Sequence, residues 1–83
     1  MVRKAGQRRN EGAIALLAAN MRKFRLERNL TIQQLADLLE VDYSQISRME
    51  RKVVNPTISV IFDIAEALDI APHKLLEPIN PSS

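Results

Sequence analysis

The stretch TIQQLADLLEVDYSQISRME, residues 31–50, holds two helix start signals that lie eleven residues apart. Thr31 is followed three positions later by Gln34, and Asp42 is followed three positions later by Gln45. In each pair a short polar side chain can cap the first turn of a helix, and the amide side chain can return the bond. Each pair therefore predicts the start of a helix.

The close spacing of the two signals leaves room for only a short first helix. It predicts helices over residues 32–39 and 43–51, joined by a tight turn around residues 39–41. Two short helices joined in this way have the layout of a helix-turn-helix unit. The same layout occurs in ordinary helical bundles, so geometry alone does not decide between packing and DNA binding.

The rest of the chain is also predicted to be helical. Apolar residues recur at intervals of three or four from Ile14 to Phe24, which predicts a helix over residues 11–28 that ends at Asn29. Two further start signals, at Thr57 and Pro72, predict a fourth and a fifth helix. We therefore expect an all-α fold of five helices, with a basic flexible arm over residues 1–10, one domain over 11–77 and a tail over 78–83.

The composition excludes several classes of function. The chain has 83 residues, 46% of them apolar, and no cysteine, so disulfides and thiolate metal sites are excluded. The single histidine, His73, has no visible metal-binding partner, and no paired carboxylates or oxyanion loop suggest an enzyme. No cofactor, metal or small-molecule ligand is expected. The apolar run AIALLAA is too short to span a membrane, so we expect a cytoplasmic protein.

Charge is unevenly distributed along the chain. Residues 1–10 carry four bases and no acid, and residues 22–52 carry seven bases against five acids. After residue 53 there are one base and four acids. Such asymmetry predicts that one side of the domain faces a polyanion.

The helix predicted over residues 43–51 has two different faces. Ile46 and Met49 are three residues apart, so they share the face that packs on the core. The opposite face carries hydrogen-bonding side chains and no acid, as expected of a helix that reads base edges in the major groove. This face consists of Tyr43, Ser44, Ser47 and Arg48, and Arg51 and Lys52 follow it.

The stretch LTIQQLADLLEVDYSQISRMERKVVNPTISVIFDIAEALDIAPHKLLE, residues 30–77, resembles the lambda repressor/Cro (Xre) helix-turn-helix family of bacterial and phage regulators. The markers are the Leu35–Ala36 pair, Val41, and the runs ISRME, NPT and IAEAL. The resemblance implies a five-helix, lambda-repressor-like DNA-binding domain, with residues 43–51 as the recognition helix. It also implies a homodimer that binds a pseudo-palindromic operator in double-stranded DNA.

The resemblance also implies roles for individual residues. In relatives the positions of Tyr43, Ser44 and Arg48 typically meet base edges, and the start of the supporting helix, around Thr31 and Gln33, meets a phosphate. From their side chains we also expect base reading by Ser47 and phosphate binding by Arg51, Lys52 and Asn55. Arg3, Lys4, Arg8 and Arg9 form the arm, which we expect to wrap the duplex or enter a minor groove. A salt bridge is expected between Arg25 and Glu50. The helix predicted after Thr57 carries more apolar side chains than its core stripe of Ile58, Ile61, Ala65 and Leu68 requires. The additional apolar residues predict a dimer interface, which consists of Val60, Phe62, Ile64 and Ala67.

Some alternatives stay open at this point. Arg48 can clamp a phosphate instead of reading a base, and the Tyr43 ring can lie on the protein surface. The N-terminal segment can cover the proposed dimer face. Glu40 and Lys52 stand where relatives often have glycine, and Ile32 stands where many have glutamine.

Together these features predict a sequence-specific DNA-binding transcriptional regulator, either a repressor or a controller that both activates and represses. The alternative is an antitoxin-like module that holds a partner protein and also binds DNA.

Overall fold

Four α-helices and one short 3-10 helix make up residues 9–79, the part of the chain that this computed structural model describes. They are α1 (Glu11–Glu27), α2 (Ile32–Leu39), α3 (Tyr43–Glu50), α4 (Ile58–Leu68) and η1 (Pro72–Leu76). No strand occurs within this range. The all-α prediction is therefore confirmed.

The expected count of five α-helices is not confirmed. The last element, η1, is a five-residue 3-10 helix that begins at Pro72. The amide of Lys74 bonds to the carbonyl of Ala71, three residues back, at 3.0 Å. So short a segment, which begins with a residue that lacks an N–H, forms the tighter 3-10 turn instead of an α-helix.

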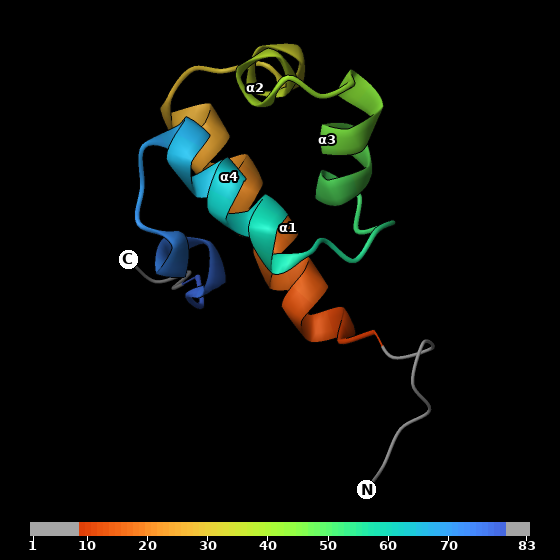
Figure 1. The fold of residues 1–83 in the computed structure, drawn as a ribbon. Helices are drawn as coiled ribbons and strands as arrows, with labels where there is room; N and C mark the ends of the chain where they lie inside the picture. Colours follow the sequence, from red (N-terminus) through yellow and green to blue (C-terminus); the bar gives the residue numbers. More distant parts are fainter. Residues whose placement is uncertain (1–8, 80–83) are drawn as a thin grey trace, which may run out of the picture.

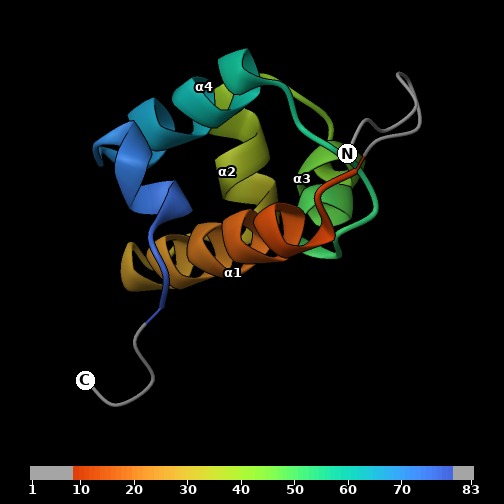
Figure 2. The same ribbon diagram turned by 90° about the horizontal axis from the view of Figure 1, so that it is seen from below.

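The helix-turn-helix unit lies to one side of the other elements. Helices α1 and α4 run in similar directions, with α4 in front of α1 in Figure 1, while α2 packs against α4 and α3 packs against α1. Helix α3 and η1 lie on opposite sides of the domain in both ribbon views (Figures 1 and 2). One face of α3 is therefore free of contact with the rest of the fold.

The helix starts follow two of the three predicted capping signals. At α2 the Gln34 amide donates to Thr31 Oγ1 at 3.0 Å, and the Thr31 amide donates to Gln34 Oε1 at 2.8 Å, so the capping box is confirmed. The Thr57 cap of α4 is also confirmed. The cap predicted at Asp42 is wrong, because its side chain makes no capping bond. The main-chain amide of Gln45 donates to the main-chain carbonyl of Asp42 at 3.0 Å, so this amide is satisfied without the Asp42 carboxylate.

All four α-helices end in the same kind of turn, the Schellman motif. A residue in the left-handed region ends each helix, and the next amide reaches back five residues to a helix carbonyl at 3.0 Å. None of the four left-handed residues is a glycine: they are Asn29 (φ 57°), Glu40 (φ 57°), Lys52 (φ 66°) and Asp69 (φ 57°). The expected stop at Asn29 is confirmed, and Glu40 adopts the left-handed conformation at the position where relatives often have glycine.

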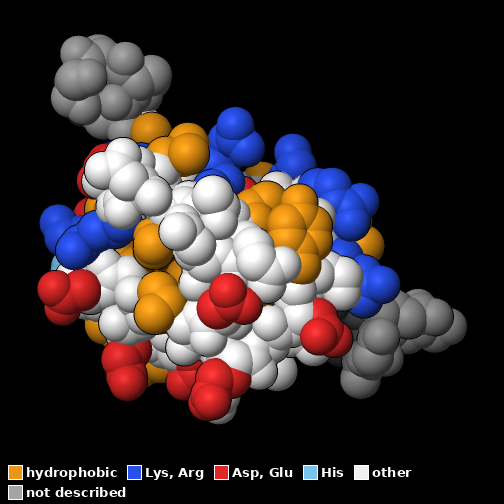
Figure 3. Space-filling model, turned by 90° about the horizontal axis from the view of Figure 1, so that it is seen from above, with side chains coloured by type: hydrophobic (Ala, Val, Ile, Leu, Met, Phe, Trp, Pro, Cys, Tyr) orange, Lys and Arg blue, Asp and Glu red, His pale blue; other side chains and the backbone are white. Residues whose placement is uncertain are grey.

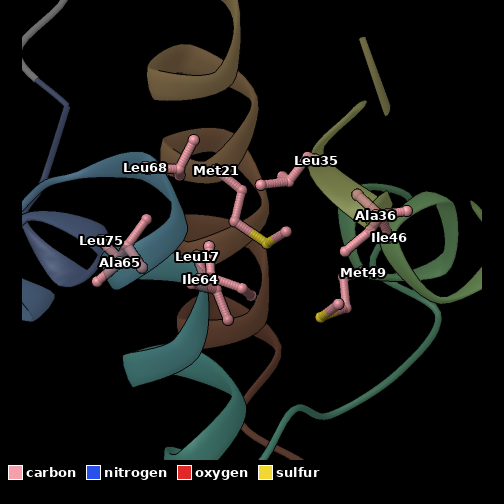
Figure 4. Close-up of a cluster of buried hydrophobic side chains, with 10 residues drawn as sticks. All are labelled: Leu17, Met21, Leu35, Ala36, Ile46, Met49, Ile64, Ala65, Leu68 and Leu75. Atoms are coloured by element: carbon pink, nitrogen blue, oxygen red, sulfur yellow. The ribbon is translucent and has the colours of Figure 1, made fainter. Parts of the chain in front are cut away.

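The core is one cluster of aliphatic side chains from every element. Figure 4 shows Met21 of α1 in the middle of this cluster, with Leu35 of α2 on one side and Leu68 of α4 on the other. Ile46 and Met49 attach α3 to the same cluster. The core is therefore continuous from η1 to the inner face of α3.

The predicted core stripe of α4 was partly wrong. Ile58 is 63% exposed, whereas Ile64 is fully buried beside Ala65 and Leu68. Ile58 and Ile64 both keep helical spacing with Ile61, so spacing alone does not fix which of them faces inward. Packing of α4 against α1 and η1 selects Ile64.

A buried amide, Asn20, joins η1 to α1. The Asn20 side chain is 2% exposed, and its Nδ2 donates to the carbonyls of Leu75 and Glu77, both at 2.9 Å. These two bonds satisfy buried polar groups at the end of the chain's last helical element. Asn20 therefore has a structural role that the sequence analysis missed.

Candidate nucleic-acid interface

The outer face of α3 carries polar side chains around a single aromatic ring. Ile46 is fully buried and Met49 is 7% exposed, so these two hold the helix to the core. Tyr43 is 49% exposed, and Ser44 and Arg48 are also exposed. The proposed base-reading residues therefore lie on the free face of α3, apart from Ser47, which is half-buried.

The acid at the end of α3 points inward. Glu50 accepts two bonds from Arg25, with Nε–Oε2 at 2.7 Å and Nη2–Oε1 at 2.9 Å, so the expected salt bridge is present. Both side chains are almost fully buried, and Arg25 also donates to the carbonyl of Leu30. The hydrogen bond to Glu50 raises the pKa of Arg25 above its ordinary value, so Arg25 keeps its positive charge. The pair removes an acid from the outer face and fixes α3 against α1.

Ser47 is engaged within the helix. Its Oγ accepts a bond from Nε of Arg51 at 3.1 Å. A half-buried hydroxyl used in this way is better suited to orienting Arg51 than to reading a base. The structure therefore favours a positioning role for Ser47.

Gln45 is exposed on the outer side of α3 and was missed as a candidate site residue. The spacing of Asp42 and Gln45 predicts a capping box that would use the Gln45 side chain, and that box does not form. Gln45 lies three residues before Arg48, so both belong to one face, and both line a shallow groove of about 260 Å³ with Asn55 and Thr57. The three-residue spacing was the signal that could have identified it.

The start of α2 presents polar groups near α3. Thr31 and Gln33 are both exposed. Gln33 Nε2 donates to Asp37 Oδ1 at 2.9 Å, and Thr31 Oγ1 caps the helix. The helix dipole favours an anion at this end of α2.

Cations gather at the other end of α3. Arg51, Lys52 and Asn55 are exposed there, in or just after the last turn of α3. Figure 3 shows that most Lys and Arg side chains on this view of the molecule lie along its upper and right edges, whereas Asp and Glu side chains lie mainly below and to the left. On this face of the domain the charges are therefore separated in space.

The predicted arm is corrected at one position. Arg9 is not free, because its guanidinium donates to the carbonyls of Lys52 and Val53 and to the carboxylate of Glu11. Asn10 caps α1, so Arg9 and Asn10 are part of the folded domain and not of a free arm. The other proposed arm residues, Arg3, Lys4 and Arg8, lie outside the described residues.

The proposed dimer interface is corrected as well. Ile64 is fully buried in the core and cannot contact a second subunit. Phe62 is 55% exposed, and Val60 and Ala67 are half-buried. Ile58, which the sequence predicted to be in the core, is instead exposed, so the exposed apolar residues of α4 include Ile58 and not Ile64.

Other kinds of site are absent from the described part of the chain. Within residues 9–79 no group of three His, Asp or Glu side chains could hold a metal ion. No helix in the same range has the length and apolar character needed to cross a membrane. The candidate site is therefore the polar face of α3 and its basic surroundings.

The fold and this face define a helix-turn-helix protein. Residues 21–75 match the family model described as helix-turn-helix (HTH_3), and the chain belongs to this family. The resemblance to Xre-type regulators is thereby confirmed.

Two curated relatives are similar in sequence. A hypothetical transcription factor of Neisseria meningitidis serogroup B (strain ATCC BAA-335 / MC58) is 39% identical over 64 residues, which cover 77% of this chain and 60% of the relative. Control protein C.SmaI of Serratia marcescens is 38% identical over 61 residues, which cover 74% of this chain and 73% of that protein. The chain thus spans less than two thirds of the Neisseria relative. These relatives are named as regulators and not as enzymes.

Solved structures show the same fold. The crystal structure of the hypothetical transcription factor NHTF from Neisseria has a TM-score of 0.79 at 32% identity, covering 99% of this chain and 93% of that one. The restriction-modification controller protein C.Esp1396I, a tetramer in complex with its natural 35 base-pair operator, has a TM-score of 0.68 at 25% identity. That match covers 78% of this chain and 96% of the controller chain.

Proposed function

We propose that this chain is a sequence-specific DNA-binding transcriptional regulator that inserts α3 into the major groove. The observation that carries the proposal is the outer face of α3, which is exposed, hydrogen-bonding and free of acid, while Glu50 is turned inward onto Arg25. A phosphate-lined groove tolerates such a face and repels carboxylates. The operator complex of C.Esp1396I supports the proposal, because that protein shares this fold.

Arg48 is the main base-reading residue in this proposal. Its guanidinium can bond in a bidentate manner to guanine, and the exposed amide of Gln45 on the same face can bond to adenine. Tyr43 and Ser44 begin the helix, where a recognition helix meets base edges. Ser47 acts indirectly, because its hydroxyl accepts a hydrogen bond from Arg51 and orients that side chain.

Phosphates flank this reading face in the proposed complex. At one end the dipole of α2 and the side chains of Thr31 and Gln33 bind the backbone. At the other end Arg51, Lys52 and Asn55 do the same. Such contacts fix the position of α3 and carry no sequence information themselves.

The regulator acts as a homodimer on a pseudo-palindromic operator. Two recognition helices related by a two-fold axis meet half-sites about 34 Å apart, one turn of DNA. The exposed apolar residues of α4, Ile58 and Phe62, are four positions apart on one face of the helix and form the interface. Val60 and Ala67, which are half-buried, lie on the opposite side of α4 and outside this patch. The domain over residues 11–77 carries both surfaces, between the arm and the tail.

Selection of binding sites from random duplex DNA tests the proposal. We expect an enriched pseudo-palindrome, and we expect affinity for it to fall steeply as salt rises. Enrichment of no motif, with equal binding to every duplex, would contradict sequence-specific recognition. Enrichment of a single half-site would retain recognition and contradict the dimer.

A further inference from the structure

The turn that ends α3 lacks the apolar anchor that the other three helix ends have. After α1, α2 and α4 the residue that follows the left-handed position packs against the core: these are Leu30, Val41 and Ile70. The equivalent residue after α3 is Val53, and its side chain is 52% exposed. The usual apolar contact of the Schellman motif is therefore missing here, and the chain meets the core again only at Val54.

Arg9 holds this turn from a distant part of the sequence. Its Nη2 donates to the carbonyl of Lys52 and its Nη1 to the carbonyl of Val53, both at 3.1 Å. Its Nε donates to Glu11 Oε2 at 2.8 Å, so the same guanidinium is tied to the first turn of α1. A planar fork of donors matches two neighbouring carbonyls, whereas the lysine ammonium is a compact point charge. A polar link therefore replaces the missing apolar one.

The turn carries two of the side chains to which the proposed function assigns phosphate contacts. Arg51 is the last residue before the left-handed position, Lys52 occupies that position, and both are exposed. Lys52 has φ 66°, a conformation that glycine adopts more readily than lysine. Its ammonium forms no ion pair with any other described residue. The Lys52 side chain is therefore free to meet an external anion.

The placement of these two cations depends on how the backbone of the turn is held. Carbonyls at the end of a helix carry partial negative charge, which repels a phosphate. Arg9 donates to the carbonyls of both Lys52 and Val53, so it offsets this charge. A turn that is already fixed also avoids the loss of conformational freedom that binding would otherwise impose.

We propose that Arg9 is a positioning residue for phosphate binding, which caps the end of the recognition helix and holds Arg51 and Lys52 in place without contacting DNA itself. The proposal rests on the proposed DNA-binding function. It differs from the arm that the sequence predicted, in which Arg9 would meet the duplex directly. Phosphate contacts carry no sequence information, so Arg9 sets affinity and not sequence preference.

Conservative variants separate positioning from charge. Arg9→Lys keeps the positive charge and removes the fork, so it should weaken binding to the selected operator and to an unrelated duplex by the same factor. The slope of log affinity against log salt should fall by up to about 1.8, or about 0.9 for each of the two phosphate contacts. Fluorescence anisotropy measures both quantities. Arg22→Lys, at an exposed position of α1, is the matched control and should change neither.

The neutral variant Arg9→Gln completes this comparison. Under the proposal it loses at least as much affinity as Arg9→Lys. If Arg9→Lys binds both duplexes like the unaltered chain and only Arg9→Gln is weaker, the charge of Arg9 meets the DNA directly and the inference is wrong.

A double-mutant cycle tests whether Arg9 acts through Arg51 and Lys52. Arg51→Gln and Lys52→Gln together remove the proposed phosphate contacts. Adding Arg9→Lys to this pair should cause no further loss of affinity, because the contacts that Arg9 supports are already absent. Losses that add in full would overturn the inference.

Hydrogen exchange without DNA tests the positioning by itself. The amides of Lys52 and Val53 bond to the carbonyls of Met49 and Arg48, and both should exchange faster in Arg9→Lys than in Arg22→Lys. Unchanged exchange would overturn the inference, as would a loss of affinity that global unfolding in urea accounts for. Absence of DNA binding by the unaltered chain would contradict the proposed function instead, and the exchange rates would still show whether Arg9 holds the turn.

Discussion

Arg25 and Glu50 form a two-pronged ion pair that connects the last turn of α1 to the last residue of α3. Their nitrogen–oxygen distances are 2.7 and 2.9 Å, and both side chains are almost fully buried. The pair is the only charged link between α1 and α3 among the described residues. The orientation of the outer face of α3 therefore depends on it.

Removing one partner of this pair should destabilise the protein strongly. Arg25→Met leaves a buried carboxylate without its cation, and we expect a loss of about 3–5 kcal/mol in the free energy of unfolding. Urea unfolding measures this loss. Arg22→Met, at an exposed position on α1, should change stability by less than about 0.5 kcal/mol. The double variant Arg25→Met, Glu50→Leu should recover most of the loss, and a double variant as unstable as Arg25→Met would contradict this account.

Arg48 and Arg51 should behave differently in DNA binding. Arg48→Ala should reduce the preference for the operator over an unrelated duplex by about 1–3 kcal/mol, because it removes a base contact. Arg51→Ala should weaken binding to both duplexes equally and lower the salt slope by about 1. Anisotropy titrations on the two duplexes separate these effects. A uniform loss in Arg48→Ala would assign that residue to a phosphate instead.

Glycine at the end of α2 should stabilise the fold. Glu40 has φ 57°, a conformation that costs a side-chain-bearing residue about 1 kcal/mol relative to glycine. We expect Glu40→Gly to raise the midpoint of urea unfolding. Asp37→Gly removes the same charge from inside the same helix, together with the bond from Gln33, and it should lower stability by about 0.5 kcal/mol. Equal destabilisation by the two variants would show that the turn is not strained.

The buried amide of Asn20 should control the attachment of η1. Asn20→Leu leaves the carbonyls of Leu75 and Glu77 without a donor, at an expected cost of about 1–3 kcal/mol. Limited trypsin digestion should cut more rapidly after Lys74, because η1 detaches from α1. Ala19→Ser, at the exposed neighbouring position, should digest like the unaltered protein. Unchanged cleavage in Asn20→Leu would mean that apolar packing alone holds η1.

An exposed aromatic on α4 should be needed for dimerisation. Phe62→Ser removes apolar area that is 55% exposed in the single chain, so it should weaken the dimer and leave the fold intact. Sedimentation equilibrium measures the dimer dissociation constant. Leu38→Ser, with a comparable exposure of 57% on α2, is the matched control. A weaker dimer in the control alone would move the interface from α4 to α2.

The features that the sequence predicted best are local ones. The Thr31 capping box and the left-handed stop at Asn29 depend on residues within a few positions of each other. The Asp42 cap failed although it is also local, because a main-chain carbonyl took the donor. The sequence shows which polar groups can pair, but it does not show which acceptor is used.

The features that the sequence predicted poorly depend on packing between distant segments. Ile58 and Ile64 satisfy helical spacing equally well, and only the neighbours of α4 decide which is buried. The bonds from Arg9 to Lys52 and Val53 join residues more than forty positions apart, so no local pattern signals them. The Arg25–Glu50 pair is just as non-local, and the family resemblance was what pointed to it.

Only Ile46, Met49 and Glu50 hold the eight-residue α3 to the rest of the domain through buried contacts. The outward residues of α3 add little to folding, so they can be exchanged without the loss of stability that limits most core substitutions. Target choice in this protein is therefore separable from its architecture. An altered outer face grafted onto the same three anchors should yield a regulator with a new operator and an unchanged melting temperature.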